Sequence, residues 1–280
     1  MNSFKVVFLL GLLTGLFLIV GGVMGGKGGM VIAFVFAVIM NFGAYWFSDK
    51  IVLGIYRAKE ISKDEVPGLH RAVEKVAVAA QVPKPKVYIL PMPVPNAFAT
   101  GRDPAHAAVA VTKGLMEMLT PEELEGVIAH EIAHVKNRDT LIQCVAATIA
   151  GAIMMLASMA RWAAIFGGYG RDERDRSGMF TLIIMAVLAP IAAMLIQMAI
   201  SRSREYVADA SGAKYLHNPL GLANALRKLD HVARRYPLGT SPATSHLFIV
   251  NPLSARGIAS LFSTHPPAEE RIMRLKKMVA

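Results

Sequence analysis

Four long runs without a charged residue constrain this chain more than any other feature of its sequence. The runs cover Val6–Gly26, Gly28–Ser48, Leu141–Ala160 and Ser177–Ser201. A helix needs about 20 apolar residues to cross a bilayer, and each run is long enough. Lys27 alone separates the first two, which predicts a tight helical hairpin. The last two contain polar residues and Pro190, and we expect a second hairpin that spans the bilayer or lies shallow or buried.

The composition agrees with a polytopic membrane protein. Of the 280 residues, 54% are hydrophobic and 18% are charged. A soluble domain usually has about 25% charged residues, and disordered chains are poor in apolar residues, so both classes are disfavoured. The single cysteine, Cys144, rules out an intrachain disulfide and a four-cysteine metal site.

Basic residues predict how the chain is oriented. It carries 30 Lys+Arg against 20 Asp+Glu, a net charge of +10. In a membrane protein this surplus sets orientation and attracts anionic lipid, so we expect a lipid bilayer and no nucleic acid as partner. The side of the expected membrane with more basic residues holds Lys5, Lys50, Arg57, Lys59, Lys63, Lys136, Arg138, Arg202, Arg204 and Lys214. Both termini and both polar segments are therefore expected in the cytoplasm.

The same pattern divides the chain into four parts. These are a first hairpin at 1–48, a polar segment at 49–140, a second hairpin at 141–201 and a polar segment at 202–280. Together they predict a mainly α fold with a small β-sheet and four candidate transmembrane helices.

The first polar segment is predicted to start with an amphipathic helix around Val66–Ala80. Two runs rich in β-branched residues follow at Lys86–Leu90 and Ala107–Thr112, and Asn96–Thr100 lies between them. Several prolines between residues 83 and 95 exclude a helix there. We therefore expect a sheet of two or three strands.

A helix with a clear start signal carries the candidate catalytic residues. Thr120-Pro121-Glu122-Glu123 forms a capping-box pattern, and the helix is predicted to run to about Asn137. It contains His130-Glu131-Ile132-Ala133-His134, in which the two histidines share one face and can bind one metal ion. Imidazole ligands suit Zn²⁺, and Glu131 can take a proton from the attacking water. The alternative is two ordinary histidines on a solvated helix face.

A third ligand is expected just after the fourth run. Glu205 and Asp209 are four residues apart and so share a helix face. Glu205 would complete a site of two imidazoles and one carboxylate, and Asp209 would fix the orientation of a zinc-binding histidine. The alternative is that both are surface acids paired with Arg202 or Arg204.

The spacing also predicts how the ligands meet. The two histidines precede the third run and Glu205 follows the fourth, so the hairpin between them would bring the ligands together. We expect the ligand helices to continue the transmembrane helices, with the metal roughly 10 Å outside the hydrocarbon at about 1.5 Å per residue.

The chain resembles the HtpX family of heat-shock membrane proteases, within the wider group that includes the CAAX prenyl proteases. The matching residues are the initial hairpin, Pro95–Ala99, His130–His134, Ser201–Asp209 and Thr264–Pro267. The resemblance implies a zincin-like (gluzincin) domain with one Zn²⁺ per chain. It also implies an endopeptidase of the cytoplasmic (inner) membrane that acts on damaged membrane proteins under stress.

Two further roles are expected, and the resemblance supports the second of them. His265 would donate a hydrogen bond to the oxyanion, because it precedes a helix at Ala268–Met278 that can fold back over the site; a local loop role is the alternative. Asn96, Ala97, Phe98 and Ala99 would form an edge strand that pairs with an extended substrate; a plain loop is the alternative.

Rival functions are an intramembrane site-2-type protease and a non-enzymatic scaffold or chaperone with a structural metal. The first is disfavoured because charged residues flank the histidine motif on both sides. A channel or transporter is disfavoured because the four runs lack intramembrane charge. A homo-oligomer is left open.

Overall fold

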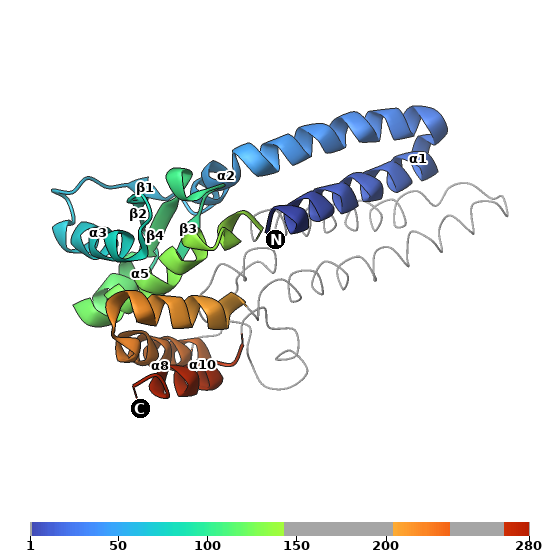
Figure 1. Ribbon diagram of the computed structural model, residues 1–280. Coiled ribbons are helices and arrows are strands. Elements are labelled where there is room, and N and C mark those ends of the chain that lie inside the picture. Colours follow the sequence, from blue (N-terminus) through green and yellow to red (C-terminus); the bar gives the residue numbers. More distant parts are fainter. Residues whose placement is uncertain (1, 143–203, 236–265, 280) are drawn as a thin grey trace.

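The computed structural model describes residues 2–142, 204–235 and 266–279. Figure 1 shows two regions within these residues: a long helical hairpin at the N-terminal end, and a mainly helical unit built around a small sheet. The predicted runs at Leu141–Ala160 and Ser177–Ser201 lie almost entirely outside the described residues, as does His265.

The predicted N-terminal hairpin is present as helix α1 (Asn2–Trp46), which bends back on itself (Figure 1). The backbone leaves the helical conformation at Gly25 (φ −147°) and Gly26 (φ 56°). The positive φ of Gly26 is a conformation that only glycine adopts without strain. The turn therefore lies just before Lys27, which already belongs to the second arm.

The two arms of α1 contact each other closely near the turn. A Cβ on Gly21 would lie 2.5 Å from the carbonyl oxygen of Gly29, so only glycine allows this approach. Farther down, Asn41 Nδ2 donates to Thr14 Oγ1 at 2.9 Å and to the carbonyl oxygen of Leu10 at 3.3 Å. The hairpin is thus fixed by small residues at one end and by polar contacts along its length.

Apolar side chains cover the outside of this hairpin. In the part of the chain that the structure describes, Gly25–Gly43 is the one helix that is long and apolar enough to cross a membrane. The first arm contributes a shorter apolar stretch, Leu10–Ile19. Side chains such as Ile19, Ile32 and Val35 are exposed rather than packed in a core, as expected for a surface that contacts lipid.

The sheet has four strands in the order β1-β2-β4-β3, one or two more than predicted. They are β1 (Lys59–Glu60), β2 (Lys86–Leu90), β3 (Ala97–Thr100) and β4 (Ala108–Thr112). β2 and β4 are parallel, whereas the two outer pairings are antiparallel. Two-residue β1 is too short to give a sequence signal. β3 is an edge strand, as the resemblance implied.

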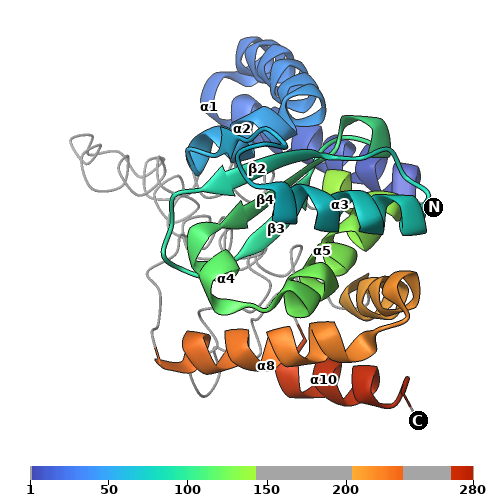
Figure 2. The ribbon, with the colours of Figure 1, turned by 90° about the vertical axis from the view of Figure 1, so that its left-hand side faces the viewer.

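Both faces of the sheet are covered, as Figure 2 shows. Side chains alternate along each strand, so Val109 and Val111 join the main core while Ala108 and Ala110 face the other way. Helices α3 (Pro67–Ala80) and α5 (Pro121–Lys136) cover the first face. Helix α2 (Ser48–Ile55) covers the second.

The remaining helices lie on the far side of α5 from the sheet (Figure 2). They are a helix over residues 204–216, α8 (Pro219–Arg235) and α10 (Ala268–Lys276). A Cβ on Gly126 of α5 would lie 2.5 Å from the backbone nitrogen of Leu222, so α5 and α8 pack in close contact. Helix α5 is therefore the centre of the unit. Short α4 (Lys113–Met118) and the 3₁₀ turn η1 (Pro104–His106) complete it.

The predicted start of α5 is confirmed, and the prediction for its end is wrong. The capping box is present, because Thr120 Oγ1 accepts from Glu123 N and Glu123 Oε2 accepts from Thr120 N. At the other end, the expectation that α5 continues into the next helix is wrong. The helix stops at Lys136, Arg138 has a left-handed φ of 57°, and a new helix starts at Asp139.

Candidate metal centre

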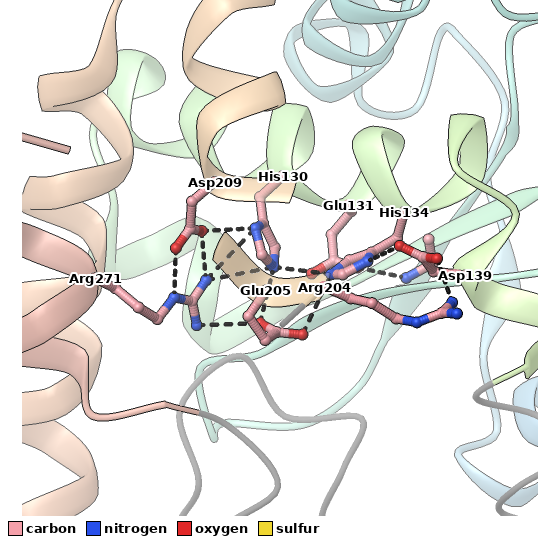
Figure 3. Close-up of polar contacts among 9 residues, drawn as sticks. His130, Glu131, His134, Asp139, Arg204, Glu205, Asp209 and Arg271 are labelled. Carbon is pink, nitrogen blue, oxygen red and sulfur yellow. Dashed lines mark hydrogen bonds and ion pairs between the residues drawn. The ribbon is translucent and has the colours of Figure 1, made fainter. Parts of the chain in front are cut away.

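Three predicted ligands converge in the interior of the unit (Figure 3). The Nε2 atoms of His130 and His134 are 3.2 Å apart. The carboxylate oxygens of Glu205 lie 3.5 Å from the first and 3.4 Å from the second. Oε2 of Glu205 makes the first of these two contacts and Oε1 makes the second. Ligands about 2.0–2.1 Å from a tetrahedral zinc are separated by roughly 3.3–3.4 Å, so the two nitrogens and the Glu205 carboxylate are spaced to hold such an ion.

Helix geometry and one glycine account for this convergence. The two histidines are one turn apart on α5 and so point the same way. Glu205 comes from the helix over residues 204–216, which crosses α5 at Gly212. A Cβ on Gly212 would lie 2.9 Å from the backbone nitrogen of His130. Only a residue without a side chain allows the carboxylate-bearing helix to approach the histidines this closely.

His130 is held by a carboxylate that is itself held by an arginine. Its Nδ1 lies 2.9 Å from Oδ1 of Asp209. Arg271 of α10 donates to both oxygens of Asp209, at 2.7 and 2.8 Å. Arg271 also lies 3.4 Å from Glu205. The Nδ1 contact fixes the ring so that Nε2 points to the other ligands.

His134 is supported in the same way by different residues. Its Nδ1 lies 3.2 Å from Oδ2 of Asp139, and Arg204 donates to the other oxygen, Oδ1. The left-handed Arg138 makes this contact possible, because it turns the chain so that Asp139 returns to the face of α5. The broken helix thus has a direct structural role at the site.

The charges of the site match a divalent cation. Four buried carboxylates, those of Glu131, Asp139, Glu205 and Asp209, face two buried guanidinium groups, those of Arg204 and Arg271. With neutral histidines, four negative and two positive charges leave two negative charges uncompensated. Such an excess in a low-dielectric interior requires a cation or bound protons.

The pKa values of both histidines reflect this negative surplus, whereas the pKa of Asp209 reflects its cationic neighbours. Burial alone would lower the pKa of His134, but its contacts with Asp139 and Glu205 raise it to about 10. Burial likewise opposes protonation of His130, yet Asp209 and Glu205 raise its pKa. Burial would raise the pKa of Asp209, but Arg271 and His130 lower it to about 2. A metal ion would replace the protons on the imidazoles, because only neutral histidine binds metal.

Glu131 lies between the ligands and the sheet. It is buried, and its Oε2 accepts a hydrogen bond from the backbone N–H of Ala99 at 2.9 Å. This contact joins the carboxylate beside the first histidine to edge strand β3. The two sets of predicted functional residues, on α5 and on β3, are therefore in direct contact.

The structure brings together most of the predicted site residues. Glu205 and Asp209 are buried, so the alternative of surface acids is excluded. The histidines are buried as well, which excludes a solvated helix face. Sequence reasoning missed Asp139, Arg204 and Arg271 as supports. Arg271 had one signal, since it shares a helix face with apolar Ala268 and Leu275.

The chain is similar to known proteases over most of its length. Residues 63–279 match the model of Peptidase family M48. A "Protease HtpX homolog" from Syntrophobacter fumaroxidans is 56% identical over 99% of both chains. Another from Pyrococcus furiosus is 57% identical, covering 96% of this chain and 93% of that protein.

A solved structure has a similar fold. The crystal structure of S. mikatae Ste24p matches with a TM-score of 0.55 and 18% sequence identity. The match covers 98% of this chain and 65% of Ste24p, so the chain corresponds to somewhat less than two thirds of that protein.

Proposed function

Because the chain belongs to peptidase family M48 and is therefore a metalloprotease, we propose that it is a membrane-anchored zinc endopeptidase. Its substrates would be misfolded or damaged membrane proteins, cut on the cytoplasmic side. The observation that carries this proposal is the convergence of two imidazole nitrogens and the Glu205 carboxylate in the interior, at spacings close to those around a tetrahedral zinc, with Glu131 beside them.

In this proposal His130, His134 and Glu205 hold one Zn²⁺, which supplies Lewis-acid chemistry by activating water and polarising the scissile carbonyl. Glu131 accepts the proton of the attacking water and passes it to the leaving amine. Asp209 keeps the Nδ1 proton of His130 in place, so that Nε2 remains available as a ligand.

We also propose that β3 binds the substrate as an added strand. Thr112 N donates to Asn96 O, so Asn96 and Phe98 turn their backbone groups to β4 while Ala97 and Ala99 turn theirs to the outer edge. The N–H of Ala99 donates to Glu131 in this structure, so an extended peptide that pairs with the edge must leave or displace that contact. The residues of β3 are buried, so the edge must be uncovered before a peptide can pair with it.

The proposal retains His265 as a hydrogen-bond donor to the oxyanion. Support comes from α10, which starts three residues later and brings Arg271 to within 3.4 Å of Glu205. A residue six positions before Arg271 is close enough along the chain to reach the same site.

The membrane part of the proposal depends on α1. The exposed apolar surface of Gly25–Gly43 supports insertion into a bilayer, and the excess of basic residues beside the runs supports a cytoplasmic catalytic unit. An intramembrane protease is not favoured, because α5 packs against the sheet and α8 rather than within the apolar hairpin.

The decisive experiment combines metal content with peptide hydrolysis on purified full-length protein in detergent. Glu131→Gln should keep one zinc per chain and lose hydrolysis of an unfolded protein substrate, because it removes the proton acceptor and no ligand. Glu205→Ala should lose zinc as well as activity.

Glu122→Gln is the matched control, since Glu122 is an exposed acid on the same helix. It should keep both zinc and activity. Full activity of Glu131→Gln would contradict the proposed protease mechanism. Normal zinc content with no hydrolysis by the parent protein would instead favour the scaffold alternative.

A further inference from the structure

Helix α2 connects the membrane hairpin to the catalytic unit. It follows the last residue of α1 after a single residue, Phe47, and leads into β1. Figure 1 shows it at the base of the hairpin, beside the sheet. A displacement of the hairpin is therefore transmitted to the sheet through this helix.

One face of α2 is packed against the sheet. Leu53 is buried in a small cluster with Phe98 of β3 and Ala110 of β4. Tyr56, just after the helix, has its ring centroid 5.6 Å from that of Phe98. The contact includes the same edge strand that donates a backbone hydrogen bond to Glu131.

The opposite face of α2 exposes large apolar side chains. Phe47, Ile51 and Ile55 are 45%, 50% and 61% exposed, and their spacing of four residues places them in one row. Trp46, the last residue of α1, is exposed next to them. This row is continuous along the chain with the apolar surface of Gly25–Gly43, so it extends the lipid-facing surface of the hairpin onto the catalytic unit.

Cationic side chains accompany this apolar row. Lys50 is exposed on α2 with its Nζ 5.6 Å from the centroid of the Phe47 ring, and Arg57 is exposed just after the helix. Arg102, which follows β3, lies 4.8 Å from the Trp46 ring. Aromatic rings with Lys and Arg are the residues that favour the headgroup layer of an anionic membrane.

We infer that α2 lies in the headgroup layer of an anionic bilayer and inserts Phe47, Ile51 and Ile55 among the lipids. This inference rests on the proposed insertion of α1 and goes beyond it. An interfacial helix buries its apolar face by about 5–10 Å, and α2 is packed directly on β3. The substrate strand is thereby held within roughly one helix diameter, about 10 Å, of the lipid surface.

The consequence concerns which substrates reach the site. A polypeptide segment that leaves the bilayer beside α1 meets β3 without first extending far into water. The proposed preference for membrane proteins would then come from the position of the edge strand rather than from a sequence-specific pocket.

The test measures lipid contact at single positions in nanodiscs that contain phosphatidylglycerol. Single cysteines at Ile51 and Ile55, in a Cys144→Ser background, are labelled with an environment-sensitive fluorophore. Nitroxide lipids with the quencher near the headgroup or deep in the acyl chain then report depth. Both positions should show blue-shifted emission and stronger loss of emission with the shallow quencher than with the deep one.

Two valines serve as matched controls, because both are exposed in the structure. Val35→Cys lies in the middle of the apolar second arm of α1, and Val78→Cys lies on α3. Val35 should be quenched best by the deep lipid, and Val78 by neither.

The controls separate the possible failures. If Val35 is not quenched, the proposed insertion of α1 fails. If Val35 is quenched but Ile51 and Ile55 behave like Val78, the bilayer contact of α2 is overturned while the proposed insertion stands. Loss of the Ile51 and Ile55 signals in nanodiscs of zwitterionic lipid alone would support the role of Lys50 and Arg57 in anionic lipid binding.

Discussion

The two histidines of the metal centre are supported by the same pattern but from different parts of the chain. His130 is supported by Asp209 and Arg271, and His134 by Asp139 and Arg204. Arg271 binds its carboxylate with two hydrogen bonds and also lies near Glu205. Asp139 instead offers one oxygen to its histidine and the other to its arginine. The first support therefore contacts two of the three ligands, and we expect it to matter more.

The largest effect is expected from Arg271→Gln. This change leaves Asp209 and Glu205 buried without their guanidinium partner, and removing one member of a buried ion pair costs about 3–5 kcal/mol. The free energy of unfolding, measured by chemical denaturation in detergent, should fall by that amount. Lys276→Gln is the control, because Lys276 is an exposed cation on the same helix and its loss should change stability little. Equal stabilities for the two variants would contradict a structural role for Arg271.

Intermediate effects are expected from Asp209→Asn and Asp139→Asn. Each removes the carboxylate that orients one histidine, and such changes lower metal affinity by about 10- to 100-fold. Competition with a chromophoric zinc chelator should show the greater loss for Asp209→Asn, since this change also disturbs Arg271, which lies 3.4 Å from a second ligand, Glu205. A greater loss for Asp139→Asn would reverse the order of the two supports.

The smallest effect is expected from Thr120→Ala. It removes the cap of α5, which is worth about 1 kcal/mol, at the end of the helix away from both supports. Stability should fall while zinc affinity stays unchanged. If zinc affinity falls too, the stability of α5 itself affects zinc binding. The zinc affinities of the Asp209 and Asp139 variants would then not measure their contacts with the histidines.

Local signals in the sequence predicted the elements that carry the ligands. The capping box located the start of α5, the histidine spacing gave its metal-binding face, and the apolar run around Lys27 gave the hairpin. Each of these depends either on residues within a few positions of one another or on an unbroken run of one residue type, and such patterns can be interpreted without knowledge of the fold.

The supports could not be predicted because they depend on distant contacts and on one backbone angle. Arg271 is 62 positions from Asp209 and Arg204 is 65 from Asp139. Asp139 reaches His134 through the left-handed conformation of Arg138. An arginine in the sequence gives no signal that its φ will be positive. A continuous helix would have directed the side chain of Asp139 away from the face that carries His134. The predicted long helix therefore gave no indication of the contact between these two residues.

The ion pair between Asp139 and Arg204 also has a topological consequence. Asp139 and Arg204 lie close in the sequence to the two ends of segment 143–203, so their ion pair holds together the chain on either side of that segment. The two stretches that supply the metal ligands, one before and one after this segment, are thus joined by a direct ion pair as well as by the chain between them.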